Sequence, residues 1–310
     1  MAYPGIAPVT VPDSWTVWAA SDVHGQRAAF DRLLAQAGLT DGADTWIAPP
    51  RTALVMTGDM VDRGPDSVGL VRRLVSLRAQ APAREGLVVL LEGNHEVQVL
   101  GGLAAEPDIF RAFLTFGGAA TLLAAGMTPD EWEGRPAEEI AARFDALVPD
   151  LRRAMASFAP YARWGDVLLV HGGPVPFMDL ATWESGAERL WIRDRFFAAP
   201  EPFPRDDAWR PFRAAGLEQV VFGHTPVAEP TLAHRGRAVN LDTWRGQVVT
   251  LAQLEPGRGL TAARFLAEPT APRAIADAPV TPEEVRAIDA ALPPVVRAWW
   301  RSLREADSRP

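Results

Sequence analysis

The chain of 310 residues contains no cysteine, which excludes disulfide bonds and thiolate metal sites. It also contains no lysine, so all 31 basic residues are arginine, a feature that we attribute to a coding bias of the source genome. No apolar run reaches the roughly 18 residues that a membrane-spanning helix requires. The formal net charge of −8 makes the chain a poor general binder of the nucleic-acid backbone. We therefore expect neither a membrane nor a nucleic acid as a partner.

The N-terminal residues Met1 to Trp15 are rich in proline and have neither the basic region nor the apolar region of a secretory signal. The expected location is therefore cytoplasmic. Hydrophobic residues make up 48% and charged residues 23%, which are ordinary values for a globular protein. We predict a single domain over residues 1–310, and the sequence leaves the oligomeric state open.

The first half of the chain alternates short apolar runs with helical patterns. We predict strands at Thr16–Ala20, Ala53–Met56 and Leu87–Leu91, with helices over about Gln26–Ala37 and Ser67–Ala79. This alternation is typical of βαβ units, so the predicted fold class is α/β. Residues from about 105 to 160 have mostly helical patterns. We interpret them as a helical insertion beside the site, although ordinary core helices would explain the pattern equally well.

The second half is richer in strand patterns. The predicted strands are Val167–Val170, Gln219–Phe222, Ala238–Leu241, Val248–Leu254 and Ala262–Phe265. A last helix is predicted over residues 282–306, because Thr281 is a suitable N-cap and Pro282 suits the first helical position.

A polar cluster follows several of these strand-like runs. The clusters are Ser21-Asp-Val-His-Gly25, Thr57-Gly-Asp59, Glu92-Gly-Asn-His-Glu96, His171-Gly-Gly173 and Gly223-His-Thr225. Ligand sites in open α/β sheets gather beyond the carboxyl ends of the strands, so we expect these clusters to converge. They contain four of the five histidines. The fifth, His234, lies in a polar loop context and is given no role.

The side chains in these clusters suit a pair of divalent metal ions. Two such ions about 3.5–4 Å apart neutralise a phosphate group and lower the pKa of a shared water. They require oxygen and imidazole ligands, with one carboxylate between them. Asp22 and His24 are two residues apart on a segment that we expect to be extended, so their side chains should point the same way. Asp59 at the next strand end suits the shared position.

The clusters together resemble the calcineurin-like metallophosphoesterase superfamily, and within it the phosphoprotein phosphatase (PPP) family. The pairing of Gly58-Asp-Met-Val-Asp-Arg-Gly64 with Gly93-Asn-His-Glu96 is highly specific, and the five blocks follow the family's order over about 205 residues. The surrounding stretches look most like the bacterial-type branch that includes Shewanella-like phosphatases. The resemblance implies a β-sandwich of two mixed sheets flanked by helices. It also implies that residues 1–310 form a metallophosphoesterase catalytic domain.

The resemblance also implies roles for individual residues. Asp22, His24 and Asp59 would bind the first metal ion, and Asp59, Asn94, His171 and His224 the second. His95 would be the general acid and Asp62 its partner, while Arg63 would bind the substrate phosphate. A second phosphate-binding arginine is expected, with Arg193 as the candidate and Arg195 as the alternative. The expected cofactors are two divalent ions, Mn first with Fe or Zn as alternatives.

The chain departs from the family pattern at three positions. Glu92 stands where the family often has arginine, Pro226 replaces the second histidine of the wider superfamily, and Trp244 stands where related chains commonly have glycine. The expected reaction is hydrolysis of a phosphomonoester, carried on a phosphoprotein, by attack of a metal-bridging hydroxide. One alternative is a symmetrical dinucleoside polyphosphate hydrolase, such as a diadenosine tetraphosphate hydrolase, which uses nearly the same blocks. A second alternative is a catalytically silent binding scaffold, which the complete ligand set disfavours.

Overall fold

The computed structural model describes residues 6–272, apart from residues 43, 104–106, 198, 200–201 and 206. The predicted C-terminal helix over residues 282–306 lies outside the described residues. Among the helices that are described, none is both long enough and apolar enough to cross a membrane.

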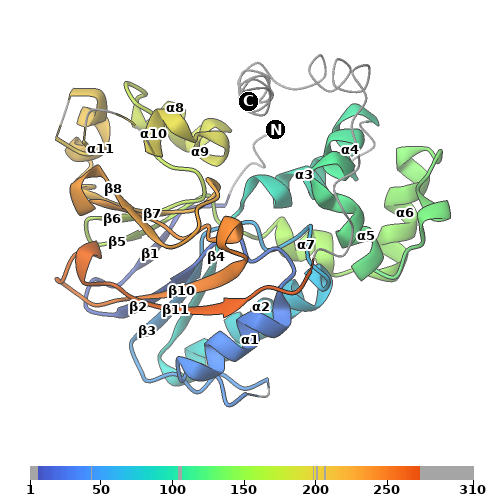
Figure 1. The fold of residues 1–310 in the computed structure, drawn as a ribbon, viewed down its shortest axis with the longest axis horizontal. Helices are drawn as coiled ribbons and strands as arrows, with labels where there is room; N and C mark the ends of the chain where they lie inside the picture. Colours follow the sequence, from blue (N-terminus) through green and yellow to red (C-terminus); the bar gives the residue numbers. More distant parts are fainter. Residues whose placement is uncertain are drawn as a thin grey trace.

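Two mixed β-sheets form the centre of the fold (Figure 1). The five-stranded sheet has the order β11-β10-β2-β3-β4, and the six-stranded sheet has the order β1-β5-β6-β7-β9-β8. The strands of the first are β2 Thr16–Ala20, β3 Thr52–Met56, β4 Leu87–Leu90, β10 Val248–Leu254 and β11 Arg264–Pro269. Those of the second are β1 Val9–Val11, β5 Ala162–Trp164, β6 Val167–Leu169, β7 Gln219–Phe222, β8 Thr231–Ala233 and β9 Ala238–Asn240. The neighbours β2, β3 and β4 are parallel, and so are β6, β7 and β9.

The alternation of side chains along β2 shows how the two sheets pack. Val17 and Ala19 lie in the cluster between the sheets, together with Val221 of β7. Trp18 and Ala20 face the opposite side and lie in the cluster beneath the helices. Both faces of the strand are buried, as expected for a sheet covered on each side. The predicted α/β fold with a β-sandwich of two mixed sheets is therefore confirmed.

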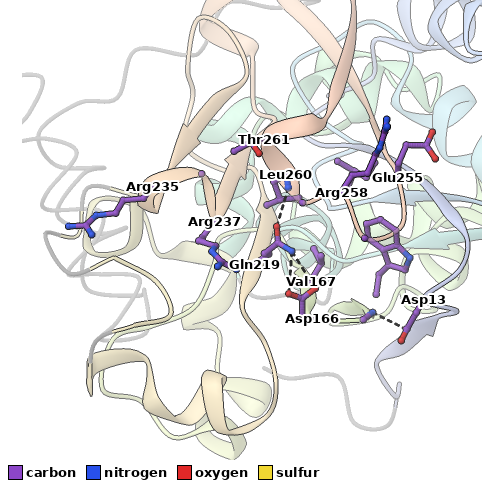
Figure 2. A pocket seen from close by; sticks show the side chains of 16 residues that line it. Asp13, Asp166, Val167, Gln219, Arg235, Arg237, Glu255, Arg258, Leu260 and Thr261 are labelled. Carbon is purple, nitrogen blue, oxygen red and sulfur yellow. Dashed lines mark hydrogen bonds between the residues drawn. The ribbon is translucent and has the colours of Figure 1, made fainter.

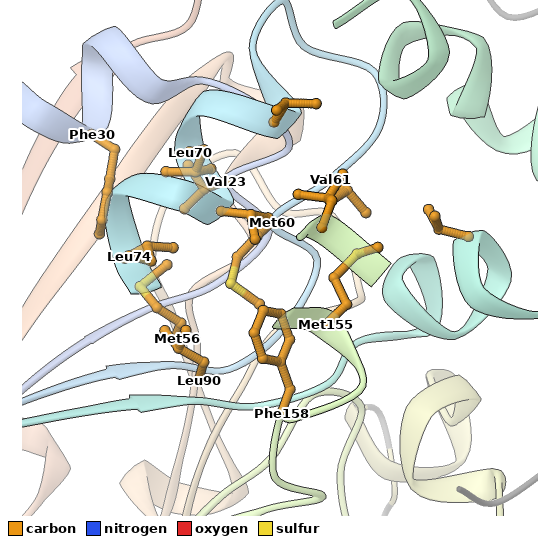
Figure 3. Packing of buried hydrophobic residues seen from close by; sticks show 14 of the residues in the cluster. Val23, Phe30, Met56, Met60, Val61, Leu70, Leu74, Leu90, Met155 and Phe158 are labelled. Atoms are coloured by element: carbon orange, nitrogen blue, oxygen red, sulfur yellow. The ribbon is translucent and has the colours of Figure 1, made fainter. Parts of the chain in front are cut away.

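Two long helices, α1 Arg27–Gln36 and α2 Ser67–Gln80, cover the outer face of the five-stranded sheet (Figure 1). The side chain of Asp66 caps α2 by accepting a hydrogen bond from the backbone N–H of Gly69 at 2.8 Å. Figure 3 shows Leu70 and Leu74 of this helix packed among buried side chains of the sheet and of α1.

The other helices occupy two regions. Between β4 and β5 lie α3 Asn94–Gly102, α4 Pro107–Phe113, the π-helical turn η2 Leu114–Gly118, α5 Ala119–Ala124, α6 Ala137–Leu147 and α7 Leu151–Met155. Between β6 and β7 lie α8 Leu180–Ser185, α9 Glu188–Trp191, α10 Asp194–Phe197 and α11 Arg210–Ala214, on the side of the six-stranded sheet (Figure 1). This second group buries a third apolar cluster against β6 and β7.

Most predicted strands lie within one residue of their observed bounds, and one was wrong. The run Ala262–Phe265 is not a strand throughout, because Leu260–Ala262 forms a 3-10 turn and β11 begins at Arg264. The strands β1, β5 and β8 were not predicted. Each has three residues that are not all buried, so no continuous apolar run marks it, whereas the equally short β6 and β9 are buried throughout.

Leu74 provides a test of the interface between α2 and the sheet. The substitution Leu74→Ala removes a fully buried side chain, so we expect the free energy of unfolding to fall by about 2–5 kcal/mol. Urea denaturation measures this change. Ser76→Ala, at an exposed position of the same helix, is the control and should change the free energy by no more than about 0.5 kcal/mol. Equal effects of the two substitutions would contradict the packing described here.

Candidate metal centre

The predicted ligands converge at the carboxyl ends of parallel strands from both sheets. Asp22 and His24 follow β2, Asp59 follows β3, and Asn94 follows β4. His171 and His224 follow β6 and β7 of the other sheet. All six side chains are buried. The sandwich therefore brings together residues that lie up to about 200 positions apart, at the edge where α/β sheets bind their ligands.

The carboxylate of Asp59 lies at the centre of the site. Its Oδ2 is 3.3 Å from Nε2 of His171, 3.7 Å from Nε2 of His95 and 3.8 Å from Nε2 of His24. Two groups of side chains that share Asp59 could each hold an ion, one with His24 and His95 and the other with His171 and His224. The resemblance implied that His95 is the general acid and not a metal ligand. Its Nε2 nevertheless lies as close to the Asp59 carboxylate as that of His24 does.

Two of the histidines are oriented by backbone carbonyl groups. His24 donates its Nδ1–H to the carbonyl oxygen of Val61 at 2.7 Å, and His171 donates its Nδ1–H to that of Thr57 at 3.1 Å. With Nδ1 as the donor to the backbone, Nε2 of each ring faces the site. Such hydrogen bonds are typical of histidines that bind metal ions. Asn94 adds a neutral oxygen, because its Oδ1 lies 2.8 Å from Nε2 of His171.

The expectation that Asp22 and His24 lie on an extended segment was wrong. Their φ angles are 51° and 44°, in the left-handed region that non-glycine residues rarely adopt. The backbone is held there because Asp22 and His24 donate their N–H groups to the carbonyl oxygens of Gly58 and Asp59. The carboxylate of Asp22 accepts hydrogen bonds from Ser21 Oγ and from the N–H of His224. Its other oxygen remains 3.9 Å from Nε2 of His24.

Gly58 allows the strand ends to approach one another. Its φ is 105°, and a Cβ atom at this position would lie 2.7 Å from Cα of Gly93 and 2.8 Å from Nδ1 of His171. A larger residue would therefore separate the Asp59 loop from two neighbouring ligand loops.

Burial and neighbouring charges shift the pKa values of Asp59 and His171 in opposite directions. Burial would raise the pKa of Asp59, but His171 and His95 hold that pKa well below its usual value. Burial likewise opposes the charge on His171, yet the adjacent Asp59 raises the pKa of His171 to about 9. Asp59 is therefore a carboxylate and His171 carries a proton at neutral pH. A divalent cation would satisfy the same lone pairs.

The surroundings of His24 and His224 favour the neutral form of each imidazole. Burial and the guanidinium of Arg63 lower the pKa of His24 well below its usual value, and burial and Arg193 do the same for His224. Neutral imidazole is the form that binds metal ions. Burial and the nearby Asp242 raise the pKa of Asp22.

A buried carboxylate oxygen without a partner supports the fit of the site to cations. Asp242 is fully buried; its Oδ1 accepts the backbone N–H of Trp244, but its Oδ2 does not accept any hydrogen bond within the described residues. An unpaired buried acceptor is costly, and a nearby cation would offset that cost. The nitrogen and oxygen donors of the site suit Mn, Fe or Zn. The residues present therefore fit a pair of divalent ions.

Glu96 is a residue of the site that was not predicted from the sequence. Its carboxylate accepts hydrogen bonds from the N–H groups of Asp59, Met60, Val61 and Gly93. Burial and the neighbouring Asp59 raise the pKa of Glu96 to about 7. Glu96 thus joins the loop that carries Asp59 to the start of α3. Glu96 is the third residue of α3, the position of the glutamate in a capping box, but no helix was predicted over Asn94–Gly102 and the signal was therefore missed.

The predicted acid pair and phosphate ligands also lie at this centre. His95 Nδ1 is 2.7 Å from Oδ2 of Asp62, so Asp62 does not form a mere surface ion pair with Arg63. The guanidinium of Arg63 lies 2.8 Å from Nε2 of His24 and 3.1 Å from Nε2 of His95.

The two candidates for the second phosphate-binding arginine differ in position. Arg193 donates its Nε–H to Nε2 of His224 at 3.0 Å. The side chain of Arg195 is exposed, and no hydrogen bond or ion pair within the described residues connects it to the site. The geometry therefore favours Arg193.

Two of the departures from the family pattern have a structural context. Glu92 is half-buried and forms an ion pair with the buried Arg189, so the charge of Glu92 is compensated locally. The ring of Trp244 lies 5.2 Å from that of His24, at the edge of the metal centre. Trp191 and Phe116 contact the rings of His224 and His95, at 5.8 Å and 6.5 Å between centroids. The site therefore has an aromatic wall made by Phe116, Trp191 and Trp244.

The interpretation of His234 as part of a polar loop was wrong. Its side chain is buried, and it bonds the backbone N–H of Phe203 and the carbonyl oxygen of Phe196. His234 thus stabilises the region of α10 and has no contact with the metal centre.

A separate cavity of about 710 Å³ lies at the opposite ends of the same strands (Figure 2). Asp166 and Gln219, at the starts of β6 and β7, are hydrogen-bonded to each other there, and Gln219 also accepts from the N–H of Leu260. None of the predicted site residues lines this cavity. It is therefore distinct from the metal centre.

Comparison with known proteins identifies a family and several relatives. Residues 16–228 match a family model described as calcineurin-like phosphoesterase. The chain is 29% identical over 178 residues to Shewanella-like protein phosphatase 2 of Arabidopsis thaliana, covering 50% of this chain and 45% of that protein. It is 28% identical over 160 residues to a symmetrical bis(5'-nucleosyl)-tetraphosphatase of Acidovorax, covering 52% of this chain and 44% of that protein. The chain thus spans less than half the length of these two relatives.

A solved structure supports the same fold. The cold-active protein-tyrosine phosphatase of a psychrophilic Shewanella superposes with a TM-score of 0.56 at 21% identity, covering 86% of this chain and 84% of that one.

The shared carboxylate of Asp59 predicts a specific loss of metal. The purified chain should hold about two divalent ions when fully loaded, and a chelator should abolish its activity until Mn is restored. Asp59→Asn should reduce the metal content measured by elemental analysis below one ion per chain, because it weakens both sites. Asp166→Asn, in the separate cavity, is the control and should keep both ions. Full activity of the metal-free chain would refute the assignment.

Proposed function

Because the chain belongs to the calcineurin-like phosphoesterase family, and is thus a metal-dependent phosphoester hydrolase, we propose that it is a dinuclear-metal phosphatase acting on phosphomonoesters. Phosphoproteins are the leading substrate class. The observation that supports this proposal most strongly is the His95–Asp62 pair, which lies beside both metal-binding groups and within reach of Arg63. The side chains proposed for proton donation, phosphate binding and metal binding thus lie close together.

The metal ions, when bound by the six proposed ligands, would neutralise the phosphate and lower the pKa of a water molecule. Arg63 and Arg193 are the proposed phosphate ligands from the chain itself. A guanidinium presents several N–H donors in a plane and suits the oxygens of a phosphate. Both arginines donate to site histidines here, at Nε2 of His24 and at Nε2 of His224. Each is therefore already aimed at the centre of the site.

His95 is the proposed proton donor to the leaving oxygen. Asp62 accepts its Nδ1–H, which fixes the ring so that Nε2 faces the site. A proton held at Nε2 can then pass to an alkoxide or phenoxide as it leaves. Asp62 remains a hydrogen-bond acceptor and an aligning group throughout.

The rival enzyme is a symmetrical dinucleoside polyphosphate hydrolase, because one of the relatives carries that name at nearly the same identity as the phosphatase. The aromatic wall could stack on either the ring of an aromatic leaving group or the nucleobase of a dinucleotide. A silent binding scaffold has less support, since the ligands and the proposed acid are all present.

A substrate panel separates the two enzymes. If phosphoproteins are the substrates, kcat/KM for phosphopeptides should exceed that for dinucleoside tetraphosphate under the same metal loading. The reverse order would favour the rival. Phosphotyrosine and phosphoserine versions of one peptide should be compared in the same assay.

Replacing His95 should separate proton donation from metal binding. His95→Asn should leave the metal content nearly intact but slow the turnover of an alkyl phosphate by ~10²–10⁴-fold. A nitrophenyl phosphate should be affected much less, because nitrophenoxide leaves without needing a proton. Asp62→Asn should show the same pattern more mildly. Equal losses on both substrates, with the metal ions still bound, would show that His95 does not donate the proton.

A further inference from the structure

The turn that carries the proposed acid partner has a strained backbone. Asp62 and Arg63 are consecutive residues with φ angles of 72° and 63°. Each left-handed non-glycine residue costs about 1–3 kcal/mol and persists only where the surroundings hold it. The turn therefore needs external support to keep the carboxylate of Asp62 and the guanidinium of Arg63 in place.

That support comes from the segment Leu114–Ala124, more than fifty residues later in the chain. The carbonyl oxygen of Gly117 accepts the N–H of Arg63 at 3.1 Å. Gly117 lies in the π-helical turn with a φ of 99°, and a Cβ atom there would lie 2.8 Å from Cγ of Arg63. π-helical turns often occur at functional sites, and this one brings a backbone carbonyl against the phosphate-binding residue.

Thr121 of α5 contacts Asp62 twice. Its fully buried hydroxyl accepts the backbone N–H of Asp62 at 3.0 Å and donates to Oδ1 of the same residue at 2.5 Å. The second carboxylate oxygen, Oδ2, is the one that lies 2.7 Å from Nδ1 of His95. Each oxygen of Asp62 thus has one hydrogen-bond partner, and together they fix the plane of the carboxylate.

We propose that Thr121 is a positioning residue of the acid pair, acting through Asp62 on the alignment of His95. This inference rests on the proposed role of His95 as proton donor. The hydroxyl matters for the carboxylate more than for the backbone, because Ser67 Oγ also accepts the N–H of Asp62 at 3.0 Å. Without Thr121, Oδ1 would be a buried acceptor with no partner, and the carboxylate could rotate away from His95.

The test compares three variants of nearly equal size. Thr121→Val removes the hydroxyl and keeps the branched shape, whereas Thr121→Ser keeps the hydroxyl. Thr115→Val is the matched control, because within the described part of the chain its hydroxyl bonds only the carbonyl oxygen of Arg111. Each is assayed for kcat on an alkyl phosphate and on nitrophenyl phosphate, with metal content and melting temperature measured alongside.

We expect Thr121→Val to lower kcat on the alkyl phosphate by about tenfold to a hundredfold, the usual range for losing a hydrogen bond to a charged group. The loss on nitrophenyl phosphate should be several times smaller, with the metal content unchanged. Thr121→Ser should recover most of the alkyl phosphate activity, and Thr115→Val should behave as the unmodified chain. If Thr121→Val does not fold, Thr121→Ala serves for the same comparison.

Equal losses on the two substrates, or no recovery by Thr121→Ser, would overturn the inference and leave Thr121 a structural residue. The variant His95→Asn distinguishes this outcome from a failure of the proposed function. If His95→Asn selectively slows the alkyl phosphate and Thr121→Val does not, only the role of Thr121 is wrong. Adding Thr121→Val to His95→Asn should cause little further loss, because both act on one proton transfer.

Discussion

The carboxylate of Asp59 is buried among imidazole nitrogens that all face its Oδ2 within 4 Å. Anionic oxygen and neutral nitrogen lone pairs at such distances repel one another unless a proton or a cation lies between them. In the chain alone, two groups supply this compensation: the guanidinium of Arg63, which contacts Nε2 of His24 and of His95, and a proton on His171, whose pKa the adjacent Asp59 raises. The unpartnered Oδ2 of Asp242 points to the same deficit of positive charge. The site is therefore arranged for cations, and its loops are held in place to receive them.

Holding these loops requires unusual backbone geometry. The φ angles are positive at Asp22, His24, Asp59, Asp62, Arg63 and His224, all of which are proposed site residues. Each such residue costs roughly 1–3 kcal/mol, so the strain must be compensated by the surroundings. Hydrogen bonds between the loops provide this compensation: the loop after β2 bonds the loop after β3, and Glu96 bonds four backbone N–H groups. The packed sandwich beneath makes these contacts possible, because it fixes the strand ends.

Much of this could be predicted from the sequence, for physical reasons. Apolar runs followed by Gly, Asp, Asn or His predicted the strand ends and their polar clusters, and the order of the clusters predicted the family. The two-sheet sandwich came from the resemblance, since periodicity predicts only a mixed α/β fold. The pattern could not predict the left-handed backbone at Asp22, because no local signal marks a non-glycine residue held there by another loop. Nor could it predict the contact of Thr121 with Asp62, which depends on the packing of α5 against a distant turn.

If Asp59 is shared by two metal ions, anomalous diffraction from crystals of the chain grown with Mn²⁺ will reveal them. Two anomalous peaks are expected about 3.5–4 Å apart, both beside the Asp59 carboxylate, the first near His24 and the second near His171 and His224. A single peak, or two peaks of which one does not contact Asp59, would contradict the shared role of Asp59.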